Sequence, residues 1–259
     1  MTLHRSLVFS LLASLPLIAQ PPGNGPRIVA AGFLQLNSAD PRAAQEFWQE
    51  VIGAAPGDDV QAGVSMIGAT ILFNKKAPSG PSGGSTIDHL AIKVPELQPF
   101  ADRLAKTKYK SSHPAADETR LMIEGPDGVR VELMEDNTMF ASREFNHIHL
   151  HSAQPKEMQE WYLKNLGGRA GTGENENGVQ LQGATLLFSK AESVAPSANR
   201  AIDHLAFEVK DLTAFCGKLT ENGVKLDTAP HAVAERKASV AVLTDPWGTT
   251  IELLERAGQ

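Results

Sequence analysis

Three histidines alternate along one short stretch of the chain, Phe145 to Ser152, which reads Phe-Asn-His-Ile-His-Leu-His-Ser. In a β-strand neighbouring side chains point to opposite faces, so His147, His149 and His151 would share one face of the strand. Neutral imidazole is the commonest protein ligand for metal ions and a frequent proton carrier. The stretch therefore predicts a polar wall suited to a metal or to proton transfer. A row of structural histidines would give the same pattern, so the interpretation depends on the neighbouring strands.

The composition is typical of a folded globular protein. The chain has 259 residues, 42% of them hydrophobic and 21% charged, which is enough for one large or two ordinary domains. Its formal net charge is −6 and it has no run of Lys and Arg, so we expect no nucleic-acid partner. The single cysteine, Cys216, lies within an expected amphipathic helix and is interpreted as a packing residue.

The first 19 residues have the layout of a secretory signal. Arg5 precedes an apolar run from Ser6 to Ala19, and residues 20–27 form a polar linker rich in proline and glycine. The run is shorter than the roughly 20 apolar residues that a membrane helix needs, and no other stretch approaches that length. We therefore expect a signal peptide at 1–19, no membrane span after processing, and a secreted or periplasmic protein.

The elements that must position the histidines occur twice in the chain. The order strand, helix, three strands is predicted twice between residues 28 and 136, and again twice between residues 145 and 256, with a linker at 137–144. Four segments return after 114 to 120 residues: Ser38–Pro41 as Ser152–Pro155, Gly68–Phe73 as Gly183–Phe188, Ile87–Ala91 as Ile202–Ala206, and Val131–Leu133 as Ile251–Leu253. The chain is therefore an internal duplication.

A histidine on the first strand, Asp-His-Leu-Ala on a later strand and a glutamate after the final turn together resemble the vicinal oxygen chelate superfamily. That family includes glyoxalase I, extradiol dioxygenases and bleomycin-binding proteins, and the resemblance covers residues 28–136 and 145–256. It implies an α+β fold in which tandem βαβββ modules form two glyoxalase-like domains with open, cup-shaped sheets. It also implies one divalent metal ion, Fe, Mn, Ni or Zn, that faces a small-molecule substrate.

Two alternative ligand sets follow from the resemblance. If each repeat closes its own cup, the metal ligands are His147, His204 and Glu252. If modules are exchanged between the repeats, His147 joins His89 and Glu132 instead. Either set combines two imidazoles with a carboxylate and leaves coordination positions open for a substrate. We expect the first set, because its members lie in one compact unit.

The first repeat departs from the pattern at the histidine strand. Phe33 stands where the second repeat has His147, and Gln35 and Asn37 replace the two following histidines. The first repeat alone therefore lacks a complete ligand set, and we interpret it as a degenerate glyoxalase-like domain.

The expected function is that of an exported, divalent-metal-dependent enzyme acting on a small oxygen-bearing substrate by isomerase, lyase or dioxygenase chemistry. Proton transfer is expected from His149, His151 or Tyr162, with pocket lining as the simpler role for the two histidines. Two family features are missing. The stretch Ala184–Phe188 has no acid to serve as the fourth glyoxalase ligand, and Val242 stands where extradiol dioxygenases have a tyrosine. The alternative is a non-enzymatic small-molecule-binding protein of the bleomycin-binding type. Monomer and homodimer are both compatible with the paired repeats.

Overall fold

The computed structural model describes residues 26–57 and 63–256 of the chain, and the predicted leader at 1–19 lies outside them. The described part consists of four βαβββ modules. Module 1 comprises β1 (Arg27–Ser38), α1 (Pro41–Glu46) with a π-helical continuation (Phe47–Ile52), β2 (Ala55–Pro56), β3 (Gly63–Met66) and β4 (Ala69–Lys75). Module 2 comprises β5 (Ile87–Val94), α2 (Gln98–Leu104), β6 (Lys110–Ser112), β7 (Arg120–Glu124) and β8 (Arg130–Glu135).

The second repeat supplies the other two modules. Module 3 comprises β9 (Glu144–Ser152), α3 (Pro155–Asn165), β10 (Arg169–Ala170), β11 (Gly178–Leu181) and β12 (Ala184–Lys190). Module 4 comprises β13 (Ile202–Lys210), α4 (Leu212–Glu221), β14 (Leu226–Val233), β15 (Ala238–Thr244) and β16 (Thr250–Arg256). The α+β prediction of tandem βαβββ modules is confirmed.

Local sequence signals explain where the helices begin and end. The Asp40 side chain accepts a hydrogen bond from the Ala43 amide at 3.2 Å, and Pro41 occupies the first turn of α1. Gly53 ends the continuation of that helix with φ +81°, a left-handed conformation that glycine adopts without steric cost. In α4, four apolar residues at helical spacing form the buried face, and Cys216 is one of them. Burial raises the pKa of the Cys216 thiol to about 11, consistent with a packing role.

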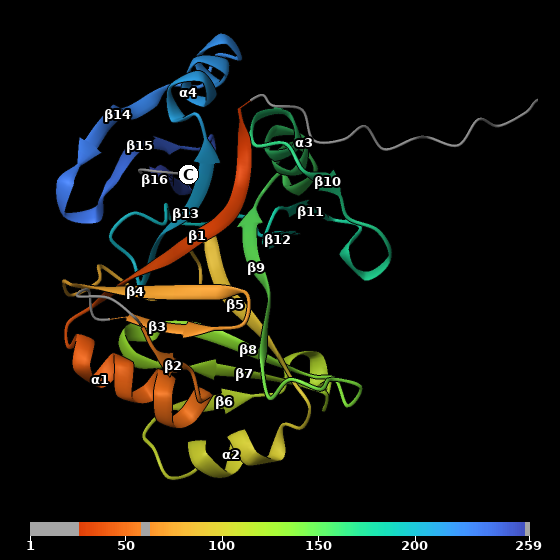
Figure 1. Cartoon of the computed structure of the whole chain (residues 1–259). Helices are drawn as coiled ribbons and strands as arrows, with labels where there is room; N and C mark the ends of the chain where they lie inside the picture. The colour runs from red at the N-terminus through yellow and green to blue at the C-terminus, as the bar shows by residue number, and fades with distance from the viewer. Residues whose placement is uncertain (1–25, 58–62, 257–259) are drawn as a thin grey trace, which may run out of the picture.

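The strands form two mixed sheets of eight strands each. Their orders are β14-β15-β16-β13-β1-β4-β3-β2 and β10-β11-β12-β9-β5-β8-β7-β6. In each sheet the first strands of two modules pair antiparallel at the centre, β1 with β13 and β9 with β5. Figure 1 shows α1 and α2 at one end of the molecule and α3 and α4 at the other, with the long strands β1 and β9 running between them. Neither sheet closes on itself, so each forms an open cup.

The sheets combine modules in a way that differs from our expectation. The first sheet contains modules 1 and 4, and the second contains modules 2 and 3, so each cup takes one module from each repeat. The interpretation in which each repeat closes its own cup is therefore corrected to the exchanged arrangement. Compactness along the sequence was a poor guide, because strand pairing is decided by contacts between strands that lie far apart in the chain.

Two crossover loops hold the exchanged arrangement together. Residues 76–86 carry the chain from the first sheet to the second, and the corresponding residues 191–201 carry it back. The two loops pair with each other: the Thr86 amide donates to the Ala195 carbonyl at 2.9 Å, and the Ala195 amide donates to the Gly84 carbonyl at 2.9 Å. These bonds satisfy backbone groups where the chain passes between the sheets, and Ser82, Ser85, Thr86 and Ser197 are the buried polar residues of the two loops.

None of the helices in residues 26–57 and 63–256 is long and apolar enough to cross a membrane.

Candidate metal centre

The histidine strand β9 lies near the centre of the second sheet with its three imidazoles on the inner face. Ile148 and Leu150, which alternate with the histidines, are 4% and 0% exposed and belong to the main hydrophobic core. A shift of one residue in strand register would bury the imidazoles in that core instead. The apolar residues of β9 thus fix the direction in which His147, His149 and His151 point.

The neighbouring strands bring two more candidate ligands to the same face. The β9–β5 register places His147 opposite Ala91, and the parallel β5–β8 register places Ala91 beside Glu132. His89 lies two residues before Ala91 on β5, on the same face. Ala91 carries only a methyl group, so the space between the imidazole and the carboxylate is left for other atoms. This arrangement joins residues that are 58 positions apart in the sequence.

Three buried ligand atoms converge there without hydrogen-bond partners. Glu132 Oε2 lies 3.5 Å from His89 Nε2 and 3.9 Å from His147 Nε2. All three atoms are inaccessible to solvent and have no partner among the described residues. Leaving buried polar atoms unpaired costs roughly 1–3 kcal/mol each, more for a charged group. A cation bound between them would satisfy all three, so the residues present fit a divalent metal ion.

Outer partners leave each of these ligand atoms free. His89 Nδ1 donates to Asp88 Oδ1 at 2.8 Å, and His147 Nδ1 donates to Asn146 Oδ1 at 2.8 Å. Each bond fixes the tautomer in which Nε2 carries the lone pair. Arg120 Nη1 donates to Glu132 Oε1 at 3.1 Å, which leaves Oε2 facing the imidazoles.

The electrostatics of the cluster favour the metal-binding protonation state at Glu132 and His147 and oppose it at His89. Burial opposes ionisation of Glu132, but the neighbouring His89 imidazole, 3.5 Å away, and the charge of Arg120 lower its pKa to about 2. Burial, and then the charge of His89, lower the pKa of His147 to about 4. Burial also disfavours charge on His89, yet the hydrogen bond with Asp88 and the nearby negative charge of Glu132 raise its pKa above 6.5. At neutral pH the cluster therefore contains a carboxylate and a neutral His147.

His149 and His151 extend the wall along β9. The His149 ring centroid lies 4.6 Å from that of His89 and 5.5 Å from that of His147, and one ring nitrogen from each of the three lies within 4.8 Å of the others. Burial, and then the charges of His89 and His147, lower the pKa of His149 to about 3. His151 lies further along the strand, with Nδ1 3.6 Å from Asp88 Oδ2.

The residues of the ligand set that we expected lie in two different sheets. His204 on β13 and Glu252 on β16 belong to the first sheet, whereas His147 belongs to the second. The structure therefore does not bring His147, His204 and Glu252 together. It brings together the alternative set, His147 with His89 and Glu132.

The first sheet holds an arginine at the corresponding place. Arg236 donates to both carboxylate oxygens of Glu252, at 2.9 and 2.6 Å, and its guanidinium lies 4.9 Å from the centre of the Phe33 ring. His204 Nε2 is 4.0 Å from Glu252 Oε2, and its Nδ1 is held by Asp203 at 2.7 Å. We call this inner face (Phe33, His204, Arg236, Glu252) the arginine cup. The inner face of the second sheet (His89, Glu132, His147, His149, His151) is the histidine cup.

Tyr162 lies on the other side of the second sheet. Its ring packs 5.3 Å from that of Phe188, which pairs with Leu150 on the outer face. Its hydroxyl donates to Asp245 Oδ2 at 2.9 Å, and the residue is completely buried. The sheet separates Tyr162 from the histidines, so the structure does not bring it to the candidate site. The expected proton-transfer role of Tyr162 is therefore corrected, because its helical position carries no information about which face of the sheet it covers.

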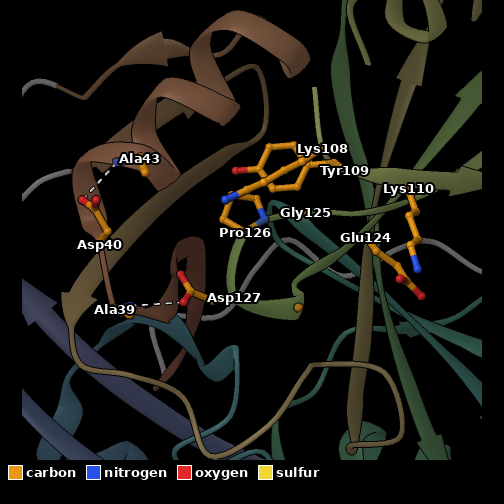
Figure 2. Close-up of a pocket in the computed structure, with 11 residues that line it drawn as sticks. Ala39, Asp40, Ala43, Lys108, Tyr109, Lys110, Glu124, Gly125, Pro126 and Asp127 are labelled. Atoms are coloured by element: carbon orange, nitrogen blue, oxygen red, sulfur yellow. Dashed lines mark hydrogen bonds between the residues drawn. The ribbon is translucent and has the colours of Figure 1, made fainter. Parts of the chain in front are cut away.

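Two open cavities lie near module 2. One, of about 450 Å³, is bordered by Asp40, Tyr109, Glu124 and Asp127, and Figure 2 shows these side chains around it; none of the candidate ligands lines it. The other, of about 430 Å³, is lined by eight residues: Lys93, Asp117, Thr119, Arg120, Met134, Glu135, Asp136 and Asn137. None of the candidate ligands lines this second cavity either. Arg120 joins it to the ligand cluster through its bond to Glu132, and Lys93 and Met134 form the next inner-face pair after Ala91 and Glu132.

The sequence reasoning missed the residues that hold the ligands in place. Asp88 and Asn146 each directly precede the histidine that they contact, so adjacency was an available signal for both. Arg236 gave no such signal, because it lies 16 positions before Glu252 and meets it only through the β15–β16 hairpin.

Comparisons with known proteins agree with this architecture. The family model of the Glyoxalase/Bleomycin resistance protein/Dioxygenase superfamily matches residues 30–133 and 144–253. Glyoxalase I from Zea mays is 14% identical with a TM-score of 0.67, over 89% of this chain and 92% of that one. The CppA protein from Streptococcus pneumoniae is 17% identical with a TM-score of 0.51, over 88% and 98%. At these identities the likeness to solved structures concerns the fold. No curated protein matches the chain in a sequence search.

Proposed function

The chain belongs to the Glyoxalase/Bleomycin resistance protein/Dioxygenase superfamily, the vicinal oxygen chelate group, and we propose on that basis that it is a divalent-metal-dependent enzyme. The ion would be held by His89, His147 and Glu132. The observation that carries the proposal is the convergence of three buried, unpartnered ligand atoms beside Ala91. Two imidazoles and one carboxylate suit Fe(II), Mn(II), Ni(II) or Zn(II). When bound, the ion would supply Lewis-acid stabilisation of negative charge on a substrate oxygen.

The substrate would be a small molecule with two neighbouring oxygens that reach the ion, and the 430 Å³ cavity next to Arg120 would take the rest of the molecule. Met134 supplies an apolar side chain to the cavity, and Lys93 supplies a cation paired with Asp136 at 3.0 Å. Arg120 lines the same cavity while it holds Glu132, so it would connect a substrate in this position with the ligand cluster.

Proton transfer would use the remaining histidines of the cup. At neutral pH His149 and His151 are both unprotonated, because burial lowers the pKa of His151 below its ordinary value and the pKa of His149 to about 3. A pKa of about 3 makes His149 a weak base, so His151 is the proton acceptor of the two. Isomerase or lyase chemistry needs such a proton acceptor. Dioxygenase chemistry needs in addition a coordination position for dioxygen, so oxygen consumption during turnover distinguishes the two reaction classes.

Metal analysis of the purified chain tests the proposal. We expect about one equivalent of a divalent ion in the wild type, loss of that ion in His147→Ala, and retention in the matched variant His204→Ala from the arginine cup. A folded wild-type protein that takes up no divalent ion would overturn the proposal. It would leave the superfamily's non-enzymatic alternative, a protein that holds a small molecule in the cup without metal.

Export remains part of the proposal through the predicted leader at residues 1–19. Cell fractionation and N-terminal sequencing of the mature protein test it. A cytosolic protein that retains its first residues would contradict export without affecting the metal site.

A further inference from the structure

Each of the three clustered imidazoles has one ring nitrogen held by a polar side chain. Asp88 holds Nδ1 of His89, and Asn146 holds Nδ1 of His147. His149 follows the same pattern with its nitrogens reversed: Nε2 is 2.7 Å from Ser189 Oγ. If the hydroxyl accepts this bond, the lone pair lies on Nδ1, which has no hydrogen-bond partner among the described residues.

We propose that His149 is a fourth protein ligand of the metal held by His89, His147 and Glu132. The inference rests on the proposed metal-dependent function. His149 lies directly opposite His89 in the β9–β5 register, and a ring nitrogen of His149 lies within 4.8 Å of one from each partner histidine. Small side-chain rotations would bring these atoms to the roughly 2.1 Å bond lengths of metal–imidazole coordination.

The adjacent strand leaves this position to His149. On the β12 side the residue paired with His149 is Leu187, whose aliphatic side chain offers no ligand atom. The donor on this side of the cluster therefore comes from β9 itself, while Ser189 on β12 orients the ring.

The arginine cup has a different residue at the same position. Gln35 corresponds to His149, and its amide donates to the carbonyls of Leu72 at 3.1 Å and Leu36 at 3.4 Å. In the cup where Arg236 neutralises the glutamate, this side chain is thus committed to the backbone. The cup that has the complete ligand set therefore has an imidazole at this position, His149, and the cup that lacks the complete set has Gln35.

A fourth ligand restricts the chemistry of the site. If the bound ion is six-coordinate, four protein ligands would leave two positions, which two neighbouring substrate oxygens would fill. Dioxygen would then have no position of its own while the substrate is chelated. His149 as a ligand therefore favours isomerase or lyase chemistry and leaves His151 as the nearby imidazole available to carry protons.

Copper and zinc binding to the full chain test the inference. Electron paramagnetic resonance of the Cu(II)-loaded protein should show coupling to three imidazole nitrogens in the wild type and to two in His149→Ala. Zinc affinity should fall by more than about 100-fold in His149→Ala, beyond the 10–100-fold typical of losing an outer-shell partner. His149→Gln, which reproduces the residue of the arginine cup, serves as a second variant if the alanine protein does not fold.

Two controls separate coordination from packing. Ser189→Ala should keep three nitrogen couplings while lowering zinc affinity about 10-fold, because only the orientation of the ring is lost. His151→Ala, on the same strand and face, should keep both the couplings and the affinity to within a few-fold. If the wild type binds the ion and a folded His149 variant keeps its affinity and nitrogen count, the fourth-ligand inference is wrong and the proposed function stands. A wild type that binds no ion would overturn both.

Discussion

The two cups share a framework and differ in what meets the glutamate. In both, a histidine on the central strand is held at Nδ1 by the preceding aspartate, at 2.8 Å in the histidine cup and 2.7 Å in the arginine cup. In both, a glutamate on the parallel neighbour lies beside an alanine, Ala91 or Ala206. In the arginine cup Arg236 occupies both oxygens of Glu252. In the histidine cup Arg120 donates only to Oε1 of Glu132, so Oε2 stays open to a bound ion.

The side chains that line the two cups also differ, with an apolar lining in the arginine cup and imidazoles in the histidine cup. The arginine cup has its own small apolar cluster, formed by Phe33, Ala206, Val240 and Leu254, and the Arg236 guanidinium stacks on the Phe33 ring. The histidine cup has imidazoles in that region. An unpartnered imidazole Nε2 occurs in both cups, at His204 as at His89 and His147, but among the described residues only in the histidine cup does the glutamate also have an unpartnered oxygen. The arginine cup thus has a carboxylate with both oxygens paired internally, and the histidine cup has a carboxylate oxygen that faces two unpaired imidazole nitrogens.

The largest expected effect is the creation of a second metal site. Phe33→His supplies the missing imidazole, and Arg236→Ala removes the cation that occupies Glu252, so the double variant should bind two equivalents of zinc instead of one. Metal analysis after dialysis measures the stoichiometry. Either substitution alone should leave one equivalent, because it changes only one of the two differences between the cups.

The single variant Arg236→Ala also measures how much its ion pair stabilises the fold. Removing the partner of the mostly buried Glu252 should cost about 1–3 kcal/mol in the free energy of unfolding, discounted for the 25% exposure of the arginine side chain. Urea unfolding measures this change.

The zinc stoichiometry of the double variant Phe33→His/Arg236→Ala has one outcome that would contradict the prediction. A double variant that folds but still binds one equivalent would show that the apolar lining, and not Arg236, excludes the ion.

A smaller loss is expected from filling the gap between the ligands. Ala91→Val places a branched side chain between His147 and Glu132, and zinc affinity should fall by roughly 100-fold or more because the ligands can no longer close on the ion. Ala206→Val makes the same change beside Glu252 in the arginine cup and should leave zinc affinity unchanged. Overpacking of either tight site costs about 1–3 kcal/mol of stability, so calorimetry of both variants accompanies the zinc titration. Equal affinities in the two variants would place the ion elsewhere.

Substitution of the aspartate that holds a ligand histidine should lower zinc affinity less than filling the gap does. Asp88→Asn weakens the bond that orients His89, and we expect zinc affinity to fall about 10–100-fold. Asp203→Asn is the matched change at His204, and it should leave affinity at the wild-type value. Isothermal titration with zinc gives both numbers. An equal loss in the two variants would mean that the aspartates act through general stability and not through the ligand that each one holds.

Much of the fold could be predicted because its signals are local and repeated. The cap at Asp40, the alternation around His147 and the return of Asp-His at residues 203–204 were sufficient for the modules and their duplication. The pairing of the modules was predicted wrongly, because nothing local in β5 states whether its partner is β1 or β9. That choice is made by contacts across the sheet and by the two paired crossover loops.

The sequence predicted which types of residue form the candidate site, but only partly which individual residues do. His147 was singled out because Phe33 replaces it in the first repeat, and the structure gives that difference its physical meaning in the two cups. The assignment of its partners failed because the same Asp-His and glutamate segments occur in both repeats. Identical signals cannot show which copy meets His147, and only the strand order decides it.

The smallest expected effect is a dependence of metal affinity on pH within the histidine cup. In the metal-free protein burial lowers the pKa of His147 to about 4, so that residue binds the ion without losing a proton at neutral pH. The pKa of His89 lies above 6.5, because the hydrogen bond with Asp88 and the nearby charge of Glu132 outweigh its burial. Protons and metal therefore compete at His89 alone, and zinc affinity should fall about tenfold per unit as pH drops below that pKa, and level off above it. Zinc titrations between about pH 5 and 8 measure the slope. A slope corresponding to two protons would show that His147 is also protonated, and would remove the electrostatic distinction between the two imidazoles.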